Sequence, residues 1–273
     1  MKWKLVCSDI DGTLLNKDRE LSERTIDTLK KVKDEMPVVL ISSRMPRAMR
    51  HLQKEINIMD HPLIAYNGGL VLDYAEGDPK ILSSIEIPVR IADAVIMFSK
   101  DLSIHTSLYH NDEWYVPEMD YWAQREMNNT KVKPIVADLR SVCKQWRLEH
   151  KGAHKIMCMG DEPDIQLLYD FLIEHHADAV HVYRSKDTYI EIASKKISKL
   201  SALDFLLNQS YDIDLSEVVA FGDNYNDEEM IGGVGMGVAV DNARAEVKAV
   251  SNAITNTNKE DGVAIFLDKL FGY

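Results

Sequence analysis

Two aspartates one residue apart follow a short apolar run near the amino terminus. Asp9 and Asp11 come directly after Leu5–Cys7 and Ser8, and Gly12 and Thr13 follow them. If extended geometry continues, both carboxylates lean to the same side of the chain. Two carboxylates this close repel each other unless a cation lies with them. The run is either a polar turn or part of a metal site, and its position after a buried strand favours the metal site.

A second acidic group follows another predicted strand, Val218–Phe221. Asp223 lies at the end of this strand and Asp227 four residues later. Alone, such a segment is also typical of an Asp- and Asn-rich turn. Together with Asp9 and Asp11, however, these residues would place strong negative charge in one crevice. A hard divalent cation relieves such repulsion, and Mg²⁺ keeps waters and shares a phosphate oxygen. We therefore expect Mg²⁺ as the cofactor.

A hydroxyl group and a lysine extend this set. Ser42 follows the apolar run Val38–Ile41, so its side chain either contacts a phosphoryl oxygen or caps the next helix. Lys199 lies at the start of a predicted helix over 198–208, where its charge opposes the helix dipole. Such local conflicts often mark functional residues. The alternative is a solvated basic cluster with the two lysines that precede it.

The order of apolar strands and helices predicts the architecture. The runs Leu5–Cys7, Val38–Ile41 and Leu63–Tyr66 lack polar alternation, and helical patterns separate them. This arrangement is typical of a parallel sheet covered on both faces, an α/β fold with a Rossmann-like core. Ligand sites in such folds lie at the carboxyl ends of the strands. The polar segments that follow these three strands and Val218–Phe221 fall at that edge.

The middle of the chain differs from the rest. Residues 86–189 are richer in Trp, Tyr, His and Met, and they alternate strand-like and helix-like segments. We interpret this segment as a second α+β domain inserted into the first. The predicted domains are therefore a core formed by residues 1–85 and 190–273, and an inserted domain formed by residues 86–189.

Composition limits the partners. The 273 residues carry a net charge of −12, from 44 acidic residues against 32 Lys and Arg. Such a surface repels nucleic acids and anionic membranes, so we expect neither as a partner. Three separate cysteines, a short first apolar run and no stretch of transmembrane length indicate a cytoplasmic protein. We expect a monomer or small homo-oligomer that acts on a small molecule.

The same residues resemble the four motifs of the haloacid dehalogenase (HAD) superfamily, and most closely its Cof-like phosphatases. The order and spacing of the motifs agree across both core segments. Ser42-Ser43-Arg44 departs from the usual Thr-Gly-Arg of the second motif, and Ser43 adds a side chain beside the phosphate. The segments that carry the resemblance are Asp9–Leu15, Ile41–Arg44, Asn67–Gly69, Ile197–Lys199, Gly222–Asp227, Gly237–Ala243 and Asn258–Ala264.

The resemblance implies a HAD fold with a C2-type cap and a catalytic role for three residues. Asp9 would attack phosphorus and form an aspartyl-phosphate. Asp11 would protonate the leaving group and then take a proton from water. Lys199 would bind phosphoryl oxygens and stabilise their charge. The inserted domain would be a mobile cap over the substrate.

The resemblance also implies a binding set. Mg²⁺ would be bound by the Asp9 carboxylate, the backbone carbonyl of Asp11, and Asp223, with Asp227 and Asn226 as ligands or supports. Phosphate would be bound by the second motif, the Asn-Gly motif and the fourth motif, through Ser42, Ser43, Asn67, Gly68 and Asn226.

These roles predict a Mg²⁺-dependent phosphatase that acts on small phosphorylated metabolites, with sugar phosphates as the favoured class. Two alternatives stay open. A HAD-type phosphomutase shares the first motif and a similarly placed cap. A non-catalytic module can also bind Mg²⁺ and phosphate with acidic residues, a hydroxyl and a lysine. The inserted domain and Asp11 argue against such a module, because it needs no acid for a leaving group.

Overall fold

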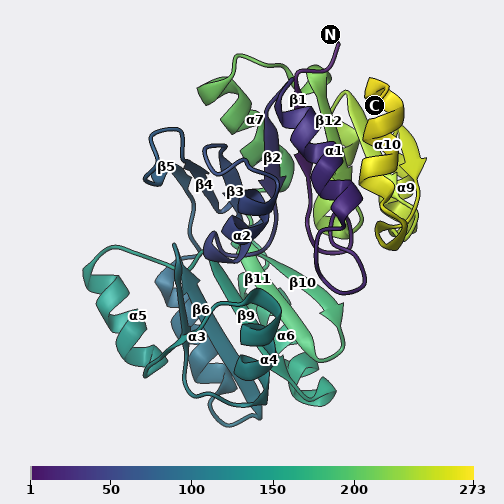
Figure 1. The fold of residues 1–273 in the computed structure, drawn as a ribbon. Coiled ribbons are helices and arrows are strands. Elements are labelled where there is room, and N and C mark those ends of the chain that lie inside the picture. Colours follow the sequence, from purple (N-terminus) through teal and green to yellow (C-terminus); the bar gives the residue numbers. More distant parts are fainter. Residues whose placement is uncertain (1) are drawn as a thin grey trace. The chain divides into compact units, whose positions relative to one another are not determined.

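The computed structural model describes residues 2–273, which divide into two compact units (Figure 1). The first unit comprises the chain up to Ser83 together with Ser198–Tyr273, and the second comprises Ser84–Ile197. The second unit extends beyond the predicted segment 86–189 at its carboxyl end. The reason is strand β11 (Tyr189–Ser194), which pairs with two other strands of the second unit.

The first unit contains an eight-stranded sheet in the order β14-β13-β12-β1-β2-β3-β4-β5. The strands from β14 to β3 are parallel, and β4 pairs antiparallel with β3. The sequence did not predict β4 and β5, which extend the sheet beyond β3. The bounds are β1 Leu5–Ser8, β2 Val38–Ile41, β3 Leu63–Ala65, β4 Leu70–Asp73, β5 Lys80–Ser84, β12 Val218–Gly222, β13 Met236–Val240 and β14 Ala253–Thr255.

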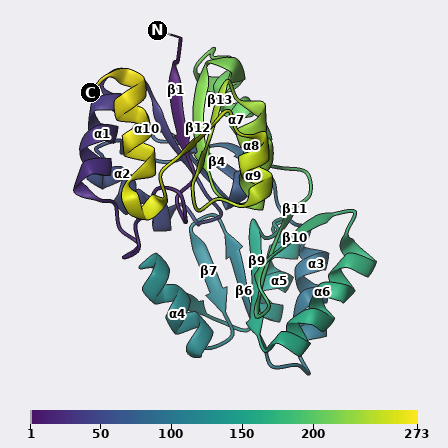
Figure 2. The ribbon, with the colours of Figure 1, turned by 90° about the vertical axis from the view of Figure 1, so that its right-hand side faces the viewer.

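Helices cover both faces of this sheet. Figure 2 shows α1, α2 and α10 on one side of it and α7, α8 and α9 on the other. The expected α/β fold with a doubly covered parallel sheet is therefore confirmed. The bounds are α1 Glu23–Lys33, α2 Arg47–Glu55, α7 Lys199–Ser210, α8 Glu228–Gly233, α9 Ala245–Val250 and α10 Gly262–Phe271.

Local sequence explains where two helices of the first unit begin. Ser22 accepts a hydrogen bond from the Thr25 amide and caps α1. The Ser198 side chain accepts a hydrogen bond from the Ser201 amide, and the Ser201 side chain accepts one from the Ser198 amide. The two bonds form a capping box at the start of α7. This box fixes the first turn of α7 and therefore the backbone of Lys199.

The second unit is an α+β domain around a six-stranded sheet, in the order β10-β11-β9-β6-β7-β8. Figure 2 shows α3, α5 and α6 on one face of this sheet, where their apolar side chains form the core, and α4 on the other side. No helix within residues 2–273 is long and apolar enough to cross a membrane. The bounds are α3 Val89–Ser99, β6 Ile104–His110, β7 Glu113–Val116, α4 Tyr121–Thr130, β8 Ile135–Val136, α5 Leu139–Leu148, β9 Lys155–Gly160, α6 Glu162–His176 and β10 Val180–Lys186.

Candidate active site

Four neighbouring strands of the first unit end in polar residues at the same edge of the sheet. The strands lie in the order β12-β1-β2-β3 and run parallel. Asp223, Asp9 and Ser42 directly follow β12, β1 and β2, and Asn67 lies in the turn after β3. The sheet therefore brings residues that are up to 214 positions apart in sequence to one edge.

A buried lysine lies between two carboxylates at this edge. Lys199 is only 1% exposed, and its Nζ is 2.5 Å from Oδ1 of Asp9 and 2.6 Å from Oδ1 of Asp227. Burial alone would lower the pKa of Lys199, but Asp227 and Asp9 raise it overall, so the ammonium stays charged. The alternative of a solvated basic cluster is therefore wrong for Lys199.

Three carboxylates, from Asp9, Asp223 and Asp227, offer oxygens within 4.8 Å of one another. Burial raises the pKa of Asp9 despite the opposing charge of Lys199, and Asp227 and Asp223 raise it further. Burial and then the charge of Asp227 raise the pKa of Asp223 to about 7. One ammonium does not balance three carboxylates, so this donor set fits a divalent cation with oxygen ligands.

Asp227 is already engaged by the protein on both oxygens. Its Oδ1 accepts from Lys199, and its Oδ2 accepts from the backbone amides of Asp223 and Asn224, each at 3.0 Å. In this arrangement Asp227 fixes the loop after β12 and positions Lys199. Direct binding of a metal by Asp227 stays a prediction.

The residues after Asp11 shape the loop to receive Asp223. The Thr13 hydroxyl donates to Oδ1 of Asp223 at 2.9 Å. Gly12 has a φ of +88°, and a Cβ at this position would lie 2.4 Å from Oδ2 of Asp223. A side chain at position 12 would therefore displace a carboxylate of the candidate metal site.

Asp11 lies apart from this carboxylate group, because two arginines bind it. Arg44 donates from Nε to Oδ2 at 2.6 Å and from Nη2 to Oδ1 at 2.7 Å, and Arg19 donates to Oδ1 at 2.9 Å. Burial raises the pKa of Asp11, but the two arginines lower it overall. The Ala48 carbonyl accepts a bond from Arg44 at 3.2 Å, which helps to orient the guanidinium.

The predicted phosphate-binding residues form a connected group. Ser42 is buried, its Oγ accepts from the Arg44 amide at 3.2 Å, and its carbonyl accepts from the Asn67 amide at 2.9 Å. Asn67 accepts from the side chain of Asn226 at 2.8 Å. Ser43 is half-buried beside them. Contact of this group with phosphate stays a prediction.

Gly68, predicted with this group, also permits a close approach of α7. Its φ is +107°, and a Cβ there would lie 2.7 Å from the Ser198 carbonyl and 2.8 Å from the Ala202 Cβ. The Asn67-Gly68 turn therefore supports the helix end that carries Lys199.

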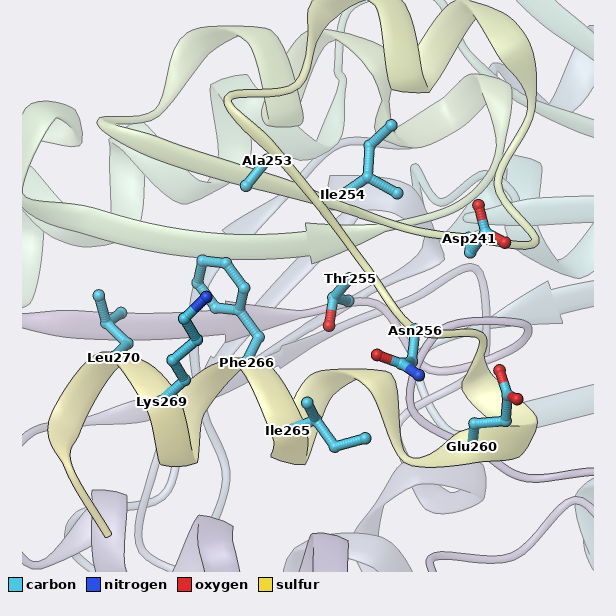
Figure 3. A pocket seen from close by; sticks show the side chains of 10 residues that line it. All are labelled: Asp241, Ala253, Ile254, Thr255, Asn256, Glu260, Ile265, Phe266, Lys269 and Leu270. Carbon is cyan, nitrogen blue, oxygen red and sulfur yellow. The ribbon is translucent and has the colours of Figure 1, made fainter.

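A separate hollow of about 690 Å³ lies in the first unit between β14 and α10 (Figure 3). Figure 3 shows Ala253 and Ile254 lining one side, and Phe266 and Lys269 of α10 lining the other. None of the predicted site residues lines it. We therefore do not assign the active site to this hollow.

Comparisons with known proteins agree with this geometry. A family model described as haloacid dehalogenase-like hydrolase matches residues 6–267. The chain belongs to this family. This HAD-like hydrolase is similar to a crystal structure of a haloacid dehalogenase-like hydrolase from Bacteroides thetaiotaomicron, with 27% identity and a TM-score of 0.87. The match covers 98% of this chain and 100% of that one.

Two curated relatives carry names of specific phosphatases. The 5-amino-6-(5-phospho-D-ribitylamino)uracil phosphatase YitU of Bacillus subtilis is 28% identical over 280 residues, which cover 98% of the hydrolase and 97% of YitU. The HMP-PP phosphatase of Escherichia coli is 26% identical over 247 residues, which cover 90% and 87% of the two chains. The resemblance to the HAD superfamily is therefore confirmed.

Sequence reasoning missed the arginines that bind Asp11. Arg44 was noted only as the last residue of the second motif, although an arginine after a strand end is a signal for an acidic partner. Arg19 gave no comparable signal, because it lies in a polar loop where a solvated arginine is ordinary.

The close approach at Gly68 predicts a specific defect. In Gly68→Ala, an alanine would have to adopt a positive φ, and its Cβ would collide with the Ser198 carbonyl just before Lys199. The substitution should therefore lower the free energy of unfolding by about 2–4 kcal/mol. Gly77→Ala is the matched control, since Gly77 has a φ of +92° with nothing within 4 Å of a Cβ. That variant should lose only about 1 kcal/mol from backbone strain. Equal losses in urea unfolding of the two variants would contradict the proposed support of α7.

The burial of Asp223 beside Asp227 predicts a gain in stability when the charge of Asp223 is removed. The pKa of Asp223 rises from 3.8 to about 7 on folding, so its ionisation destabilises the fold increasingly between about pH 4 and pH 7. In chelator at pH 8, Asp223→Asn should raise the thermal midpoint by about 2–4 °C. It should also reduce the stabilisation that added Mg²⁺ gives the wild type. The control Asp204→Asn, at an exposed position of α7, should change neither quantity. A lower midpoint for Asp223→Asn in chelator would contradict the claim that the charge of Asp223 destabilises the metal-free protein.

Proposed function

We propose that this chain is a Mg²⁺-dependent phosphatase that hydrolyses phosphate monoesters of small metabolites through an aspartyl-phosphate on Asp9. The observation that carries the proposal is the buried Lys199 bound to Asp9 beside the carboxylate of Asp223. The family match and the names of the relatives support a phosphatase.

Asp9 is the proposed nucleophile. Its side chain lies at the end of the central strand β1, and the Asp9 amide donates to the Phe221 carbonyl at 3.0 Å, so its backbone is fixed. Lys199 binds one carboxylate oxygen and orients the other for attack on phosphorus. The same ammonium stabilises negative charge on the phosphoryl oxygens as the transition state forms.

Asp9, the Asp11 carbonyl and Asp223 would bind Mg²⁺, with Asp227 and Asn226 as ligands or supports. When bound, the metal offsets the repulsion between the attacking carboxylate and the phosphate. The Thr13 hydroxyl and Asp227 would keep the loop after β12 in place during this step.

Asp11 is the proposed acid and base, and Arg44 is its positioning residue. Asp11 would give a proton to the leaving oxygen and then take one from the attacking water. Arg44 and Arg19 lower the pKa of this carboxyl, so the bonds described above favour the ionised form that takes a proton, and the acid role requires these bonds to weaken when substrate binds. The bidentate bond from Arg44 fixes the plane of the carboxyl group, since Nε and Nη2 each bind a different oxygen of Asp11.

The proposed substrates are small phosphorylated metabolites, with sugar phosphates as the favoured class. The name of YitU contains a phospho-D-ribitylamino group, which supports a phosphorylated polyol as the substrate of this chain. The HMP-PP phosphatase is named for a different compound, which supports a wider range of phosphorylated substrates. The inserted unit Ser84–Ile197 is proposed as the mobile cap. We further propose that the protein is cytoplasmic and works as a monomer or small homo-oligomer.

The nucleophile predicts the effect of one substitution on phosphate release. Asp9→Asn should lower release from an aryl phosphate and from a panel of sugar phosphates by at least about 10³-fold, because the amide cannot form the acyl phosphate. Chelator should abolish wild-type release, and Asp204→Asn should retain it. Full activity of Asp9→Asn would overturn the mechanism. Transfer of phosphate within a bisphosphorylated sugar, in place of release, would indicate a phosphomutase.

The bond between Arg44 and Asp11 predicts a dependence on the leaving group. Lysine cannot form the bidentate bond, so Arg44→Lys should misplace the acid. The loss in kcat/KM should be about tenfold or more for an alkyl phosphate and much smaller for 2,4-dinitrophenyl phosphate, whose leaving group needs no proton. In an Asp11→Asn background, Arg44→Lys should cause little further loss. Equal losses in kcat/KM for both substrates would instead indicate that Arg44 contacts the phosphate group of the substrate.

A further inference from the structure

A tight loop presents Arg19 to the candidate active site. The Asn16 side chain accepts from the amides of Asp18 and Glu20 at 2.9 Å and 3.2 Å, and the Arg19 amide donates to the Asn16 carbonyl at 3.1 Å. The Leu15 carbonyl, at the base of the loop, accepts from the side chain of Asn258 at 2.6 Å. The loop is therefore fixed both internally and at its base.

Arg19 is not needed to neutralise its partner. Arg44 already occupies both oxygens of Asp11, so the cluster of two arginines and one carboxylate has an excess positive charge. The side chain of Arg44 is 7% exposed, whereas that of Arg19 is 52% exposed. The excess charge is therefore accessible on Arg19, which uses only part of its five N–H donors on Asp11.

The contact with Asp11 indicates which part of the substrate lies near the positive charge of Arg19. Under the proposed function, Asp11 contacts the leaving oxygen, so a residue bonded to Asp11 lies beside the leaving group and not beside the transferred phosphoryl group. Guanidinium groups bind carboxylates and phosphates with paired N–H donors.

We propose that Arg19 binds a second anionic group, a carboxylate or a phosphate, on the leaving group of the substrate. This inference rests on the proposed function and narrows its substrate class to phosphate esters with a further negative charge near the scissile bond. Arg19 also lowers the pKa of Asp11, so its removal should change kcat alike for every substrate. The inference therefore concerns the difference in KM between substrates with and without the second anionic group.

The test uses three substrates with one carbon scaffold. Glycerol 3-phosphate, 3-phosphoglycerate and glycerol 1,3-bisphosphate carry a hydroxyl, a carboxylate and a phosphate at the far carbon. Wild-type KM should be about three- to tenfold lower for at least one of the two charged compounds than for glycerol 3-phosphate, as expected for a partly exposed ion pair. Arg19→Gln should remove this preference, and Arg19→Lys should restore part of it.

Arg24→Gln is the matched control. Arg24 is also an arginine in an ion pair with an aspartate, Asp268, and its side chain is 50% exposed, but it joins α1 to α10. This variant should keep the wild-type preference. The preference should also weaken with added salt, because exposed charges are screened.

A binding measurement separates this inference from the proposed function. Calorimetric titration of the same three compounds into Asp9→Asn, with and without Arg19→Gln, does not depend on turnover. Tighter binding of a charged compound that is lost with Arg19→Gln supports the inference even if no hydrolysis is found. The arm that shows the effect identifies the carboxylate or the phosphate. No preference in either measurement, or a preference that survives Arg19→Gln, overturns it.

Discussion

The buried contact of Lys199 with Asp9 and Asp227 is the interaction on which the rest of the site depends. A charge this deeply buried is tolerated only with paired opposite charges, and removal of one partner would leave an uncompensated ion. The capping box at Ser198 and the close approach of Gly68 bring Lys199 to that position. The fold of the first unit therefore fixes the charge balance of its own candidate active site.

The charges at this edge of the sheet do not cancel. Three carboxylates face one ammonium, so the protein without a cation carries the energetic cost of their repulsion. Burial raises the pKa of Asp9 and of Asp223, and the neighbouring carboxylates raise both further. A bound divalent cation would remove it, which couples metal binding to stability. Asp11 differs from both, because Arg44 and Arg19 lower its pKa.

Much of this arrangement could be predicted from the sequence, because strand ends are strong signals. Unalternating apolar runs gave β1, β2, β3 and β12, and their order implied that Asp9, Ser42, Asn67 and Asp223 lie at one edge. Lys199 was ambiguous, since only its burial separates a site residue from a solvated lysine, and burial depends on packing between distant segments.

The remaining features depend on tertiary contacts that leave no local pattern. The predicted end of the inserted unit was residue 189, the first residue of β11, because a strand at a domain boundary looks the same whichever sheet it joins. Arg19 was missed because its partner Asp11 is reached only through the loop conformation set by Asn16. Asp227 was predicted as a metal ligand or a support, and the structure shows that both of its oxygens accept from protein donors. Direct binding of a metal by Asp227 stays a prediction.

The most direct test of the central claim is to look for the phosphoryl group on Asp9. Wild-type protein is mixed with Mg²⁺ and an aryl phosphate, quenched in acid during turnover, reduced with borohydride and digested for peptide mass spectrometry. The account predicts that residue 9 is recovered as homoserine, the product of a reduced aspartyl-phosphate, and that Asp11 is unmodified. Turnover with no modification of Asp9, or with modification of another residue, would contradict it.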